Sequence, residues 1–264
     1  MRRSGPALTL TFTLALLLFV TSNRTARAAA PLETETARFP MRGVFEAEGS
    51  LEVQRSKDGR ESALPLAFEY ALANRLTLMA EPVPFTRIRP TDAAGARGPG
   101  DLEVTLSGLL LPETLHRPAL AIAGEVKIPT AESPLIGSDQ LDYSGYAIAS
   151  KRFGRFDTHA NLGFTIVGHP AGVPVSNTLN YALAGEYSIN AAWTIVGEVL
   201  GNTAALAEGS SSNESTVAPE IWGGETIAML GTRWTCTPRL TASFGLTVDN
   251  AGAVLLRPGL STRF

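Results

Sequence analysis

Apolar and polar residues alternate along most of the chain after residue 43. Between Phe45 and Gln54 the odd positions are apolar or small, and the even positions hold Glu46, Glu48, Ser50, Glu52 and Gln54. A period of two places successive side chains on opposite faces of a β-strand, whereas a helical pattern repeats every 3.6 residues. This segment is therefore predicted to be a strand with one apolar and one polar face.

The same alternation recurs in segments of about ten residues, separated by turns rich in Gly, Pro and Asn. Clear segments are 64–72, 101–110, 119–128, 157–166, 179–187, 193–199, 240–248 and 254–264, and weaker ones are 76–85, 141–153 and 225–234. A transmembrane β-strand needs about 9–11 residues, and bacterial single-chain barrels have an even number of strands. The pattern predicts an all-β fold, a transmembrane antiparallel up-and-down β-barrel of about 12 strands over residues 43–264.

The predicted connections are of two kinds. Very short turns contain Asn74-Arg75, Gly154-Arg155, Ile189-Asn190 and Pro238-Arg239, and longer polar links cover about 87–100, 129–140, 169–177 and 203–221. Short periplasmic turns and long external loops are typical of outer-membrane barrels. Aromatic residues near predicted strand ends, where interfacial girdles occur, are Phe85, Tyr146, Phe153, Phe156, Tyr187, Trp193, Trp234 and Phe264. A soluble sandwich alternates in the same way with its apolar face inward, and these three features favour the membrane barrel over it.

The first thirty residues predict export. Arg2 and Arg3 precede the apolar run Ala7–Val20, and small residues then fit cleavage after Ala28 or Ala30. The run of about 14 residues is short of the roughly 20 that span a bilayer as a helix. We therefore expect residues 1–30 to be a cleaved signal peptide. Residues 31–42 precede the first strand and form either a periplasmic extension or a plug inside the lumen.

Charge and cysteine content narrow the alternatives. Residues 1–30 hold four of the 22 basic residues and no acid, which leaves 18 basic against 25 acidic residues, a net charge of −7. An acidic chain argues against nucleic acid as a partner. Cys236 is the single cysteine, so an internal disulfide is impossible. The expected partners are outer-membrane lipid, a small-molecule solute and, through a C-terminal aromatic at Phe264, the barrel assembly machinery.

The polar face of the predicted strands supplies the candidate lumen residues. They are Glu46, Glu48, Glu52, Glu69, Glu103, Glu125, Lys127, Asp157, His159, Asn161, Glu186, Glu198, Arg257 and Arg263, with Lys151 as a further possibility. Rings of charged side chains select the solutes that pass a pore. The alternative is a salt-bridged interior that closes the lumen, since eight strands enclose a filled barrel and about 16–18 strands an aqueous channel. Diffusion of small molecules and a structural, non-conducting barrel are therefore both open.

Catalytic motifs are sparse. Asp157 and His159 share a strand face and could form an acid–base pair, which leaves a lipid-acting barrel enzyme as a third reading. The chain has no G-x-S-x-G motif, no Gly-rich phosphate loop and no metal-ligand spacing. The sequence therefore assigns no catalytic, cofactor-binding or metal-binding residue.

Several short motifs from Gly98 onward resemble a known family. They include Gly98–Leu102, Ala123–Thr130, Ser150–Arg152, His159–Gly163, Gly197-Glu198 after Trp193, and Leu230–Trp234 before a Thr-Pro-Arg turn. Over roughly 60% of its length, the chain is similar to the transporter-like outer-membrane β-barrel family of the meta-pathway of phenol degradation. The resemblance implies an outer-membrane location and passage of small, often aromatic or apolar, compounds.

Overall fold

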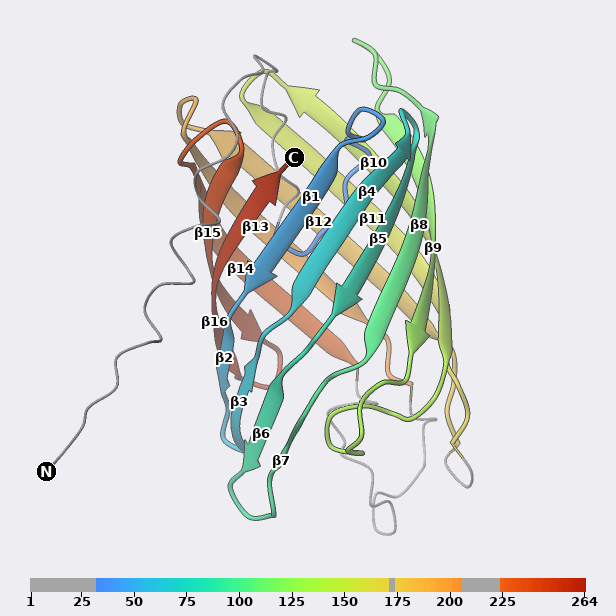
Figure 1. The fold of residues 1–264 in the computed structure, drawn as a ribbon, viewed down its shortest axis with the longest axis vertical. Coiled ribbons are helices and arrows are strands. Elements are labelled where there is room, and N and C mark those ends of the chain that lie inside the picture. Colours follow the sequence, from blue (N-terminus) through green and yellow to red (C-terminus); the bar gives the residue numbers. More distant parts are fainter. Residues whose placement is uncertain (1–31, 171–173, 206–223) are drawn as a thin grey trace, which may run out of the picture.

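Twelve antiparallel strands close into one barrel (Figure 1). The computed structural model describes residues 32–170, 174–205 and 224–264, so the predicted signal peptide, residues 1–30, lies outside the described residues. The ring consists of β1 (Phe45–Ser50), β4 (Leu66–Ala73), β5 (Leu76–Pro82), β8 (Leu102–Leu111), β9 (Ala119–Ile128), β10 (Asp142–Phe153), β11 (Phe156–Ile166), β12 (Thr178–Ser188), β13 (Trp193–Asn202), β14 (Glu225–Thr235), β15 (Leu240–Asp249) and β16 (Val254–Arg263).

Each strand of the ring pairs with its neighbours in chain order, and β16 pairs with β1 to close it. The closure ends at the C-terminus, where the Phe264 N–H donates a 2.8 Å hydrogen bond to the Phe45 carbonyl. Closure leaves no strand edge in the ring, which matters because an unpaired backbone group in hydrocarbon costs several kcal/mol. The prediction of an all-β, antiparallel up-and-down barrel of about 12 strands is confirmed.

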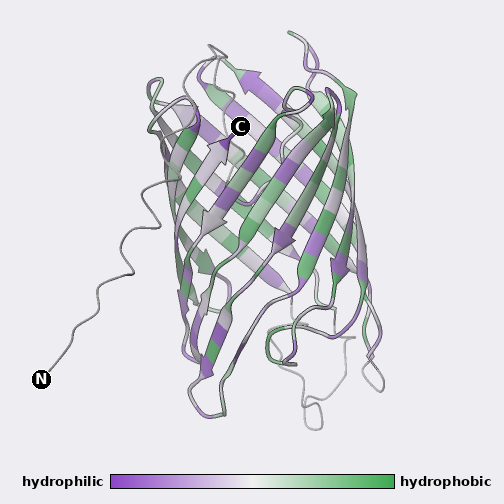
Figure 2. Ribbon diagram, in the orientation of Figure 1, coloured by the Kyte–Doolittle hydropathy of each residue, from purple (hydrophilic) through white to green (hydrophobic). Residues whose placement is uncertain are grey.

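The side chains sort by face as the alternation predicts (Figure 2). Large apolar residues are exposed on the outside, with Leu162 63% and Leu183 61% accessible, whereas Ser150, Glu186 and Glu198 on the opposite faces are buried. A soluble sandwich would bury its apolar face, so this arrangement excludes it. Within the described ranges, no helix is long and apolar enough to cross a membrane.

The wall continues beyond the ring on one side, in a part that we call the extension. It consists of β2 (Glu52–Arg55), β3 (Gly59–Ala63), β6 (Thr86–Pro90) and β7 (Ala96–Gly98), which project past the rim opposite the C-terminus (Figure 1). The expectation of a loop over 87–100 is therefore wrong, because β6 and β7 form a hairpin there. Pro90 and Gly95 suggest a loop in the sequence, but they flank a short turn between two strands. Between the ring and the extension, the pairing of β4 with β5 stops and resumes as the pairing of β3 with β6. Pro82 and Pro84 lie in this gap, and neither has a backbone N–H to donate.

The two rims differ as expected. The rim with the C-terminus carries short turns, including Gly154-Arg155, where Gly154 adopts φ +62°, a conformation that glycine tolerates best. Residues 129–141, 167–170, 174–177 and 203–205 lie at the other rim, and residues 171–173 and 206–223 of these links lie outside the described residues. Trp193 and Trp234 stack at the short-turn rim with ring centroids 5.8 Å apart. Tyr146, predicted for the aromatic girdle, is instead mid-strand and faces inward, where its hydroxyl contacts Glu125.

Candidate functional site

Residues 32–40, which we call the plug segment, lie inside the barrel. The Glu198 carboxylate on β13 accepts hydrogen bonds from the N–H groups of Leu32 (2.5 Å) and Thr34 (2.9 Å), and from the Thr34 hydroxyl (2.8 Å). On the other side of the segment, the Arg257 guanidinium donates to the Leu32 carbonyl. Of the two sequence-based alternatives for residues 31–42, the structure thus shows the plug for the part it describes.

A second group of contacts holds the plug segment nearer the short-turn rim. The Ala37 N–H donates a 2.9 Å hydrogen bond to the Ser150 hydroxyl on β10. Arg38 forms ion pairs with Asp157 (2.7 Å) and with Glu113 in the β8–β9 turn. Ala37 and Phe39 pack in the apolar cluster of the lumen. The segment therefore contacts the wall along its length, and it narrows the lumen.

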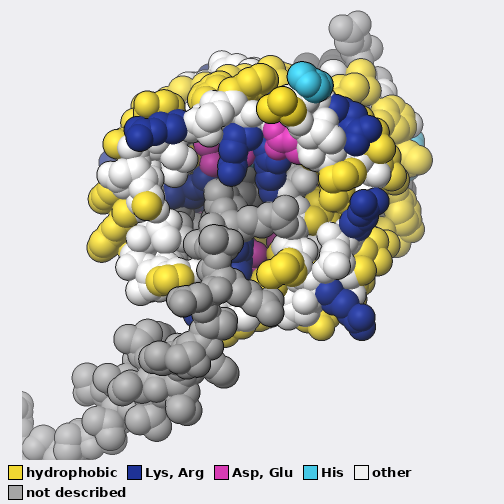
Figure 3. Space-filling view, turned by 90° about the horizontal axis from the view of Figure 1, so that it is seen from above, with side chains coloured by type: hydrophobic (Ala, Val, Ile, Leu, Met, Phe, Trp, Pro, Cys, Tyr) yellow, Lys and Arg dark blue, Asp and Glu magenta, His cyan; other side chains and the backbone are white. Residues whose placement is uncertain are grey.

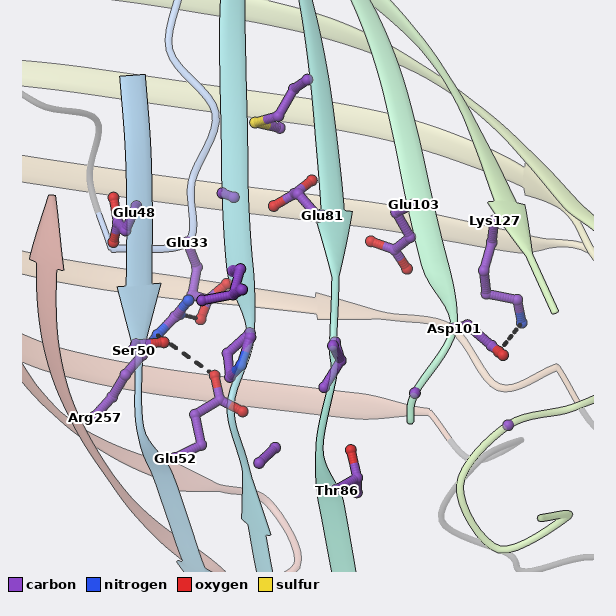
Figure 4. Close-up of a pocket in the computed structure, with 18 of the residues that line it drawn as sticks. Glu33, Glu48, Ser50, Glu52, Glu81, Thr86, Asp101, Glu103, Lys127 and Arg257 are labelled. Carbon is purple, nitrogen blue, oxygen red and sulfur yellow. Dashed lines mark hydrogen bonds and ion pairs between the residues drawn. The ribbon is translucent and has the colours of Figure 1, made fainter. Parts of the chain in front are cut away.

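An open space remains between the plug segment and the long-link rim, and we call it the outer cavity (Figure 4). Its volume is about 510 Å³. Its acidic lining residues are Glu33, Glu35, Glu48, Glu52, Glu61, Glu81, Asp101 and Glu103, and its basic ones are Lys127 and Arg257. With eight acidic and two basic side chains, the lining of this cavity is predominantly acidic.

Besides Glu35 of the plug segment, three acidic side chains that the wall contributes to the outer cavity form no ion pair among the described residues. Glu48, Glu81 and Glu103 are drawn toward the cavity in Figure 4, and within the part of the chain that the structure describes none of them has an ion-pair partner. Glu81 and Glu103 are direct cross-strand neighbours on β5 and β8. Like charges placed opposite each other repel, so a cation between them would relieve that repulsion.

The mouth at the short-turn rim has the opposite charge. Its space of about 340 Å³ is lined by Arg152, Arg155, Arg233, Arg239, Arg263 and the single acid Glu46. Figure 3 looks onto this rim and shows basic and acidic side chains within a ring of apolar ones. The lumen therefore changes from acidic to basic along its axis.

All fourteen candidate lumen residues lie on the inward face of the wall. Glu48, Glu52, Glu103, Lys127 and Arg257 line the outer cavity, and Glu46, Glu69 and Arg263 line a smaller cavity beside the plug segment. Of the remaining six, Asp157, Asn161 and Glu198 bind the plug segment, and His159 lies beside Glu186. Glu125 accepts a hydrogen bond from the Tyr146 hydroxyl on the wall. Lys151, the further possibility, is different: it shares a face with the exposed Phe153, and its ammonium bonds to the Thr114 carbonyl at the rim.

Sequence reasoning missed part of the site. Glu81 was not found because the two faces of 76–85 are indistinct around Pro82 and Pro84. Glu33, Glu35 and Arg38 belong to the plug segment, which has no periodic pattern that could assign a face. Glu61 lies on β3, outside every predicted strand.

Asp157 and His159, which share a strand face and could have formed an acid–base pair, have other partners. Asp157 binds Arg38 and Arg152, whereas the His159 Nδ1 lies 2.8 Å from the Ser150 Oγ and its Nε2 lies 3.6 Å from Glu186. This serine–histidine–glutamate row resembles a hydrolytic triad in composition. Ser150 is only 1% exposed and its Oγ accepts the Ala37 N–H, so a substrate carbonyl cannot reach it while the plug segment is in place.

The plug segment itself carries a perturbed carboxyl group. Burial, together with the neighbouring carboxylates of Glu69 and Glu125, raises the pKa of Glu35 from 4.5 to about 7. Its backbone carbonyl accepts a 3.2 Å hydrogen bond from the Asn161 amide. The segment therefore holds a group that changes charge near neutral pH.

Sequence comparison finds no matching family model. It finds no match among curated proteins either. The fold is similar to the COG4313 outer membrane channel from Pseudomonas putida F1, with a TM-score of 0.68 and 13% identity over 90% of this chain and 100% of that one. It is also similar to the NanC porin, with a TM-score of 0.56 and 10% identity over 82% and 98%. For the KdgM porin, the values are 0.54 and 10% over 83% and 99%. At these identities the likeness shows the fold, which is that of outer-membrane channel barrels.

Proposed function

We propose that this chain is an outer-membrane channel through which small molecules diffuse. The observation that carries the proposal is a charged cavity of about 510 Å³ inside a barrel whose outer face is apolar. The plug segment limits the cross-section, so the passing solutes are small. Diffusion down a gradient needs no cofactor. The fourteen inward residues then set which solutes pass, as rings of charged side chains do in pores.

The lining of the outer cavity supports a class of solute. Leu32, Met79, Val83 and Ile136 give it an apolar part beside its carboxylates. The short motifs that resemble the phenol meta-pathway family suggest aromatic or apolar compounds, although no family model matches the chain. We therefore propose solutes with an apolar or aromatic body and a neutral or cationic polar group, because an anionic group would meet the unneutralised carboxylates.

A flux panel tests both the channel and the solute class. Proteoliposomes containing the purified protein are loaded with benzylamine, benzyl alcohol or benzoate, which share a ring and differ in charge. We expect benzylamine and benzyl alcohol to leave faster than benzoate. Equal rates for all three would contradict the charge selection, and rates equal to those of empty liposomes would contradict the channel.

The alternative is a structural, non-conducting barrel. The dense hydrogen bonding of the plug segment favours it, since Glu198 alone accepts three bonds from Leu32 and Thr34. Planar-bilayer recordings separate the two functions. Stepwise currents from the wild-type protein support the channel. An absence of steps in both the wild type and a Glu198→Ala variant supports the closed barrel.

The third reading, a lipid-acting enzyme, has less support. It would need Ser150 to become accessible, and no such state is shown. We propose that the protein is not an enzyme, and a lipase assay of the wild type and His159→Ala checks this. Any wild-type hydrolysis that His159→Ala abolishes would contradict the proposal.

Two further proposals concern export and assembly. Leu32 is bound inside the lumen. We propose that residues 1–30 are cleaved during export, so that this segment does not have to pass through the narrowed pore. The intact mass of the purified protein tests this proposal.

Phe264 pairs with Phe45 at the barrel seam, with ring centroids 5.9 Å apart. We propose that Phe264 also serves as the assembly signal. Phe264→Ala should then lower the amount of assembled barrel in cells, while the rim control Phe156→Ala should not.

A further inference from the structure

Five arginines form one continuous patch on one face of the extension. Three of them form a row across neighbouring strands, and the other two form a second pair beside it. Arg55 on β2 is the cross-strand neighbour of Arg60 on β3, and Arg60 is the neighbour of Arg89 on β6. Arg87, two positions before Arg89 and hence on the same face, is the neighbour of Arg97 on β7. All five side chains are exposed. We call this set the arginine face.

The arginine face points away from the lumen. Arg55 lies opposite Val254 of β16, a position on the exposed apolar face of that strand. The residues of opposite parity on the same strands, such as Glu61 and Thr86, line the outer cavity instead. The five guanidinium groups are therefore directed toward the surroundings of the barrel.

Folding of the chain alone does not explain this arrangement. Like charges directly opposite each other on a sheet are destabilising, and here three strands in succession carry arginine at the same level. Within residues 32–170, 174–205 and 224–264, no carboxylate forms an ion pair with any of the five. An external polyanion would remove the repulsion.

The position of the arginine face identifies the kind of anion. On the same outward face, Leu51, Leu64 and Phe85 are exposed immediately before the arginines on the barrel side. Apolar side chains thus give way to arginines within two to four residues along each strand. This is the change expected where hydrocarbon ends and headgroups begin. The extension also lies on the long-link rim, which faces outward in an outer-membrane barrel.

We propose that the arginine face binds the phosphate groups of phosphorylated glycolipid in the outer leaflet. Arginine presents a planar fork that matches phosphate oxygens bidentately. Neighbouring strands are about 4.8 Å apart, so the row Arg55–Arg60–Arg89 can contact one phosphate from two sides or two adjacent phosphates. The inference rests on the outer-membrane location and orientation, and it is independent of whether the lumen conducts.

A binding assay on the full-length protein in neutral detergent tests the proposal. The probe is fluorescently labelled, bis-phosphorylated lipid A, and its anisotropy reports binding. The variant R55Q/R60Q/R89Q removes the row, and R42Q/R75Q/R117Q removes the same charge from exposed positions at the short-turn rim. We expect the row variant to bind about tenfold more weakly and the control to bind like the wild type. Equal affinities of all three proteins would overturn the proposal, as would equal losses in the two variants.

Two further measurements distinguish lipid phosphate from soluble phosphate and control for any effect of the substitutions on folding. A dephosphorylated glycolipid should bind all three proteins weakly, and inorganic pyrophosphate at the same concentration should not displace lipid A. Displacement would assign the face to soluble anions and overturn the lipid. Without lipid, R55Q/R60Q/R89Q should unfold at a temperature no lower than the wild type, because repulsion is removed. Lipid A should then raise the unfolding temperature of the wild type more than that of the variant, and the reverse order would contradict binding.

Discussion

Leu32 and Glu198 meet inside the barrel, where the Leu32 N–H donates a 2.5 Å hydrogen bond to a carboxylate 166 positions later in the chain. The Glu198 side chain is buried, and its other partners also belong to the plug segment. A buried carboxylate is costly unless donors surround it. Glu198 and the plug segment therefore stabilise each other. Without the carboxylate the plug segment should be bound less firmly, and without the plug segment the buried carboxylate would lose its hydrogen-bond donors.

Removing the Glu198 carboxylate should loosen the plug segment. In Glu198→Ala the Leu32 and Thr34 donors lose their partner, and an unsatisfied buried donor costs about 1–3 kcal/mol. We expect larger and noisier single-channel currents, with the open fraction raised about tenfold. Glu103→Ala removes the same charge from the lumen but has no hydrogen bond to the plug segment, so its open fraction should stay at the wild-type level. A matching rise in both variants would show that charge, and not anchoring, controls the current.

The plug segment should be held less firmly as the pH rises through neutrality. Glu35 has its pKa raised from 4.5 to about 7 when the segment is in place. A raised carboxyl pKa means that the bound position of the plug segment favours protonated Glu35. The stability that this protonation gives to the bound segment is complete below pH 4.5 and is lost as the pH passes 7. We expect the open fraction to increase severalfold from pH 5 to pH 8. Glu35→Gln cannot ionise, and a pH dependence that persists unchanged in this variant would assign the effect to another group.

The barrel wall could be predicted from sequence because lipid contact imposes a strict rule. Outward positions at membrane depth are mostly apolar, so strands such as 157–166 show alternation without any tertiary information. The extension escaped this rule in part, since Thr86–Pro90 carries Arg87 and Arg89 on its outer face, where membrane strands carry apolar residues. Those arginines looked like loop residues because the prediction assumed hydrocarbon along the whole wall.

For the interior, the sequence predicts which residues face inward but not which of them contact each other. Alternation places Glu186 and Glu198 inward, but it cannot say that Glu186 pairs with Arg233 and that Glu198 binds Leu32 and Thr34. The first contact depends on the pairing registers of β12, β13 and β14, and the second on an aperiodic segment that enters the lumen. The Ser150–His159 contact was missed for the same reason, because it depends on the pairing register of β10 with β11 and not on spacing.

The outer cavity should make the channel cation-selective. Glu81 and Glu103 face the cavity side by side without an ion-pair partner, so the double variant Glu81→Gln/Glu103→Gln removes two acidic groups at little change in volume. We expect its potassium-to-chloride permeability ratio, from reversal potentials in a salt gradient, to fall severalfold toward unity. The matched control Asp92→Asn/Glu132→Gln removes two carboxyl groups from exposed positions that do not line the outer cavity. Should this control lower the ratio as much as the double variant, the selectivity would lie outside the outer cavity.

The direction of the two strand faces can be tested by one substitution on each. Leu162 lies in mid-strand on the outward face, and its side chain is 63% accessible. Leu162→Arg would therefore place a charge in hydrocarbon. We expect it to lower the free energy of unfolding by about 2–4 kcal/mol in a denaturant titration in lipid vesicles. Glu103→Arg introduces the same side chain into the outer cavity, between Glu81 on β5 and Lys127 on β9. Because water reaches this cavity, the cost should stay below about 1 kcal/mol. Asn161→Arg would be a poorer comparison, because Asn161 binds the Glu35 carbonyl and a larger side chain would push against the plug segment. If Glu103→Arg proved as destabilising as Leu162→Arg, the lumen would not be wet at this level, and the channel would lose its main physical support.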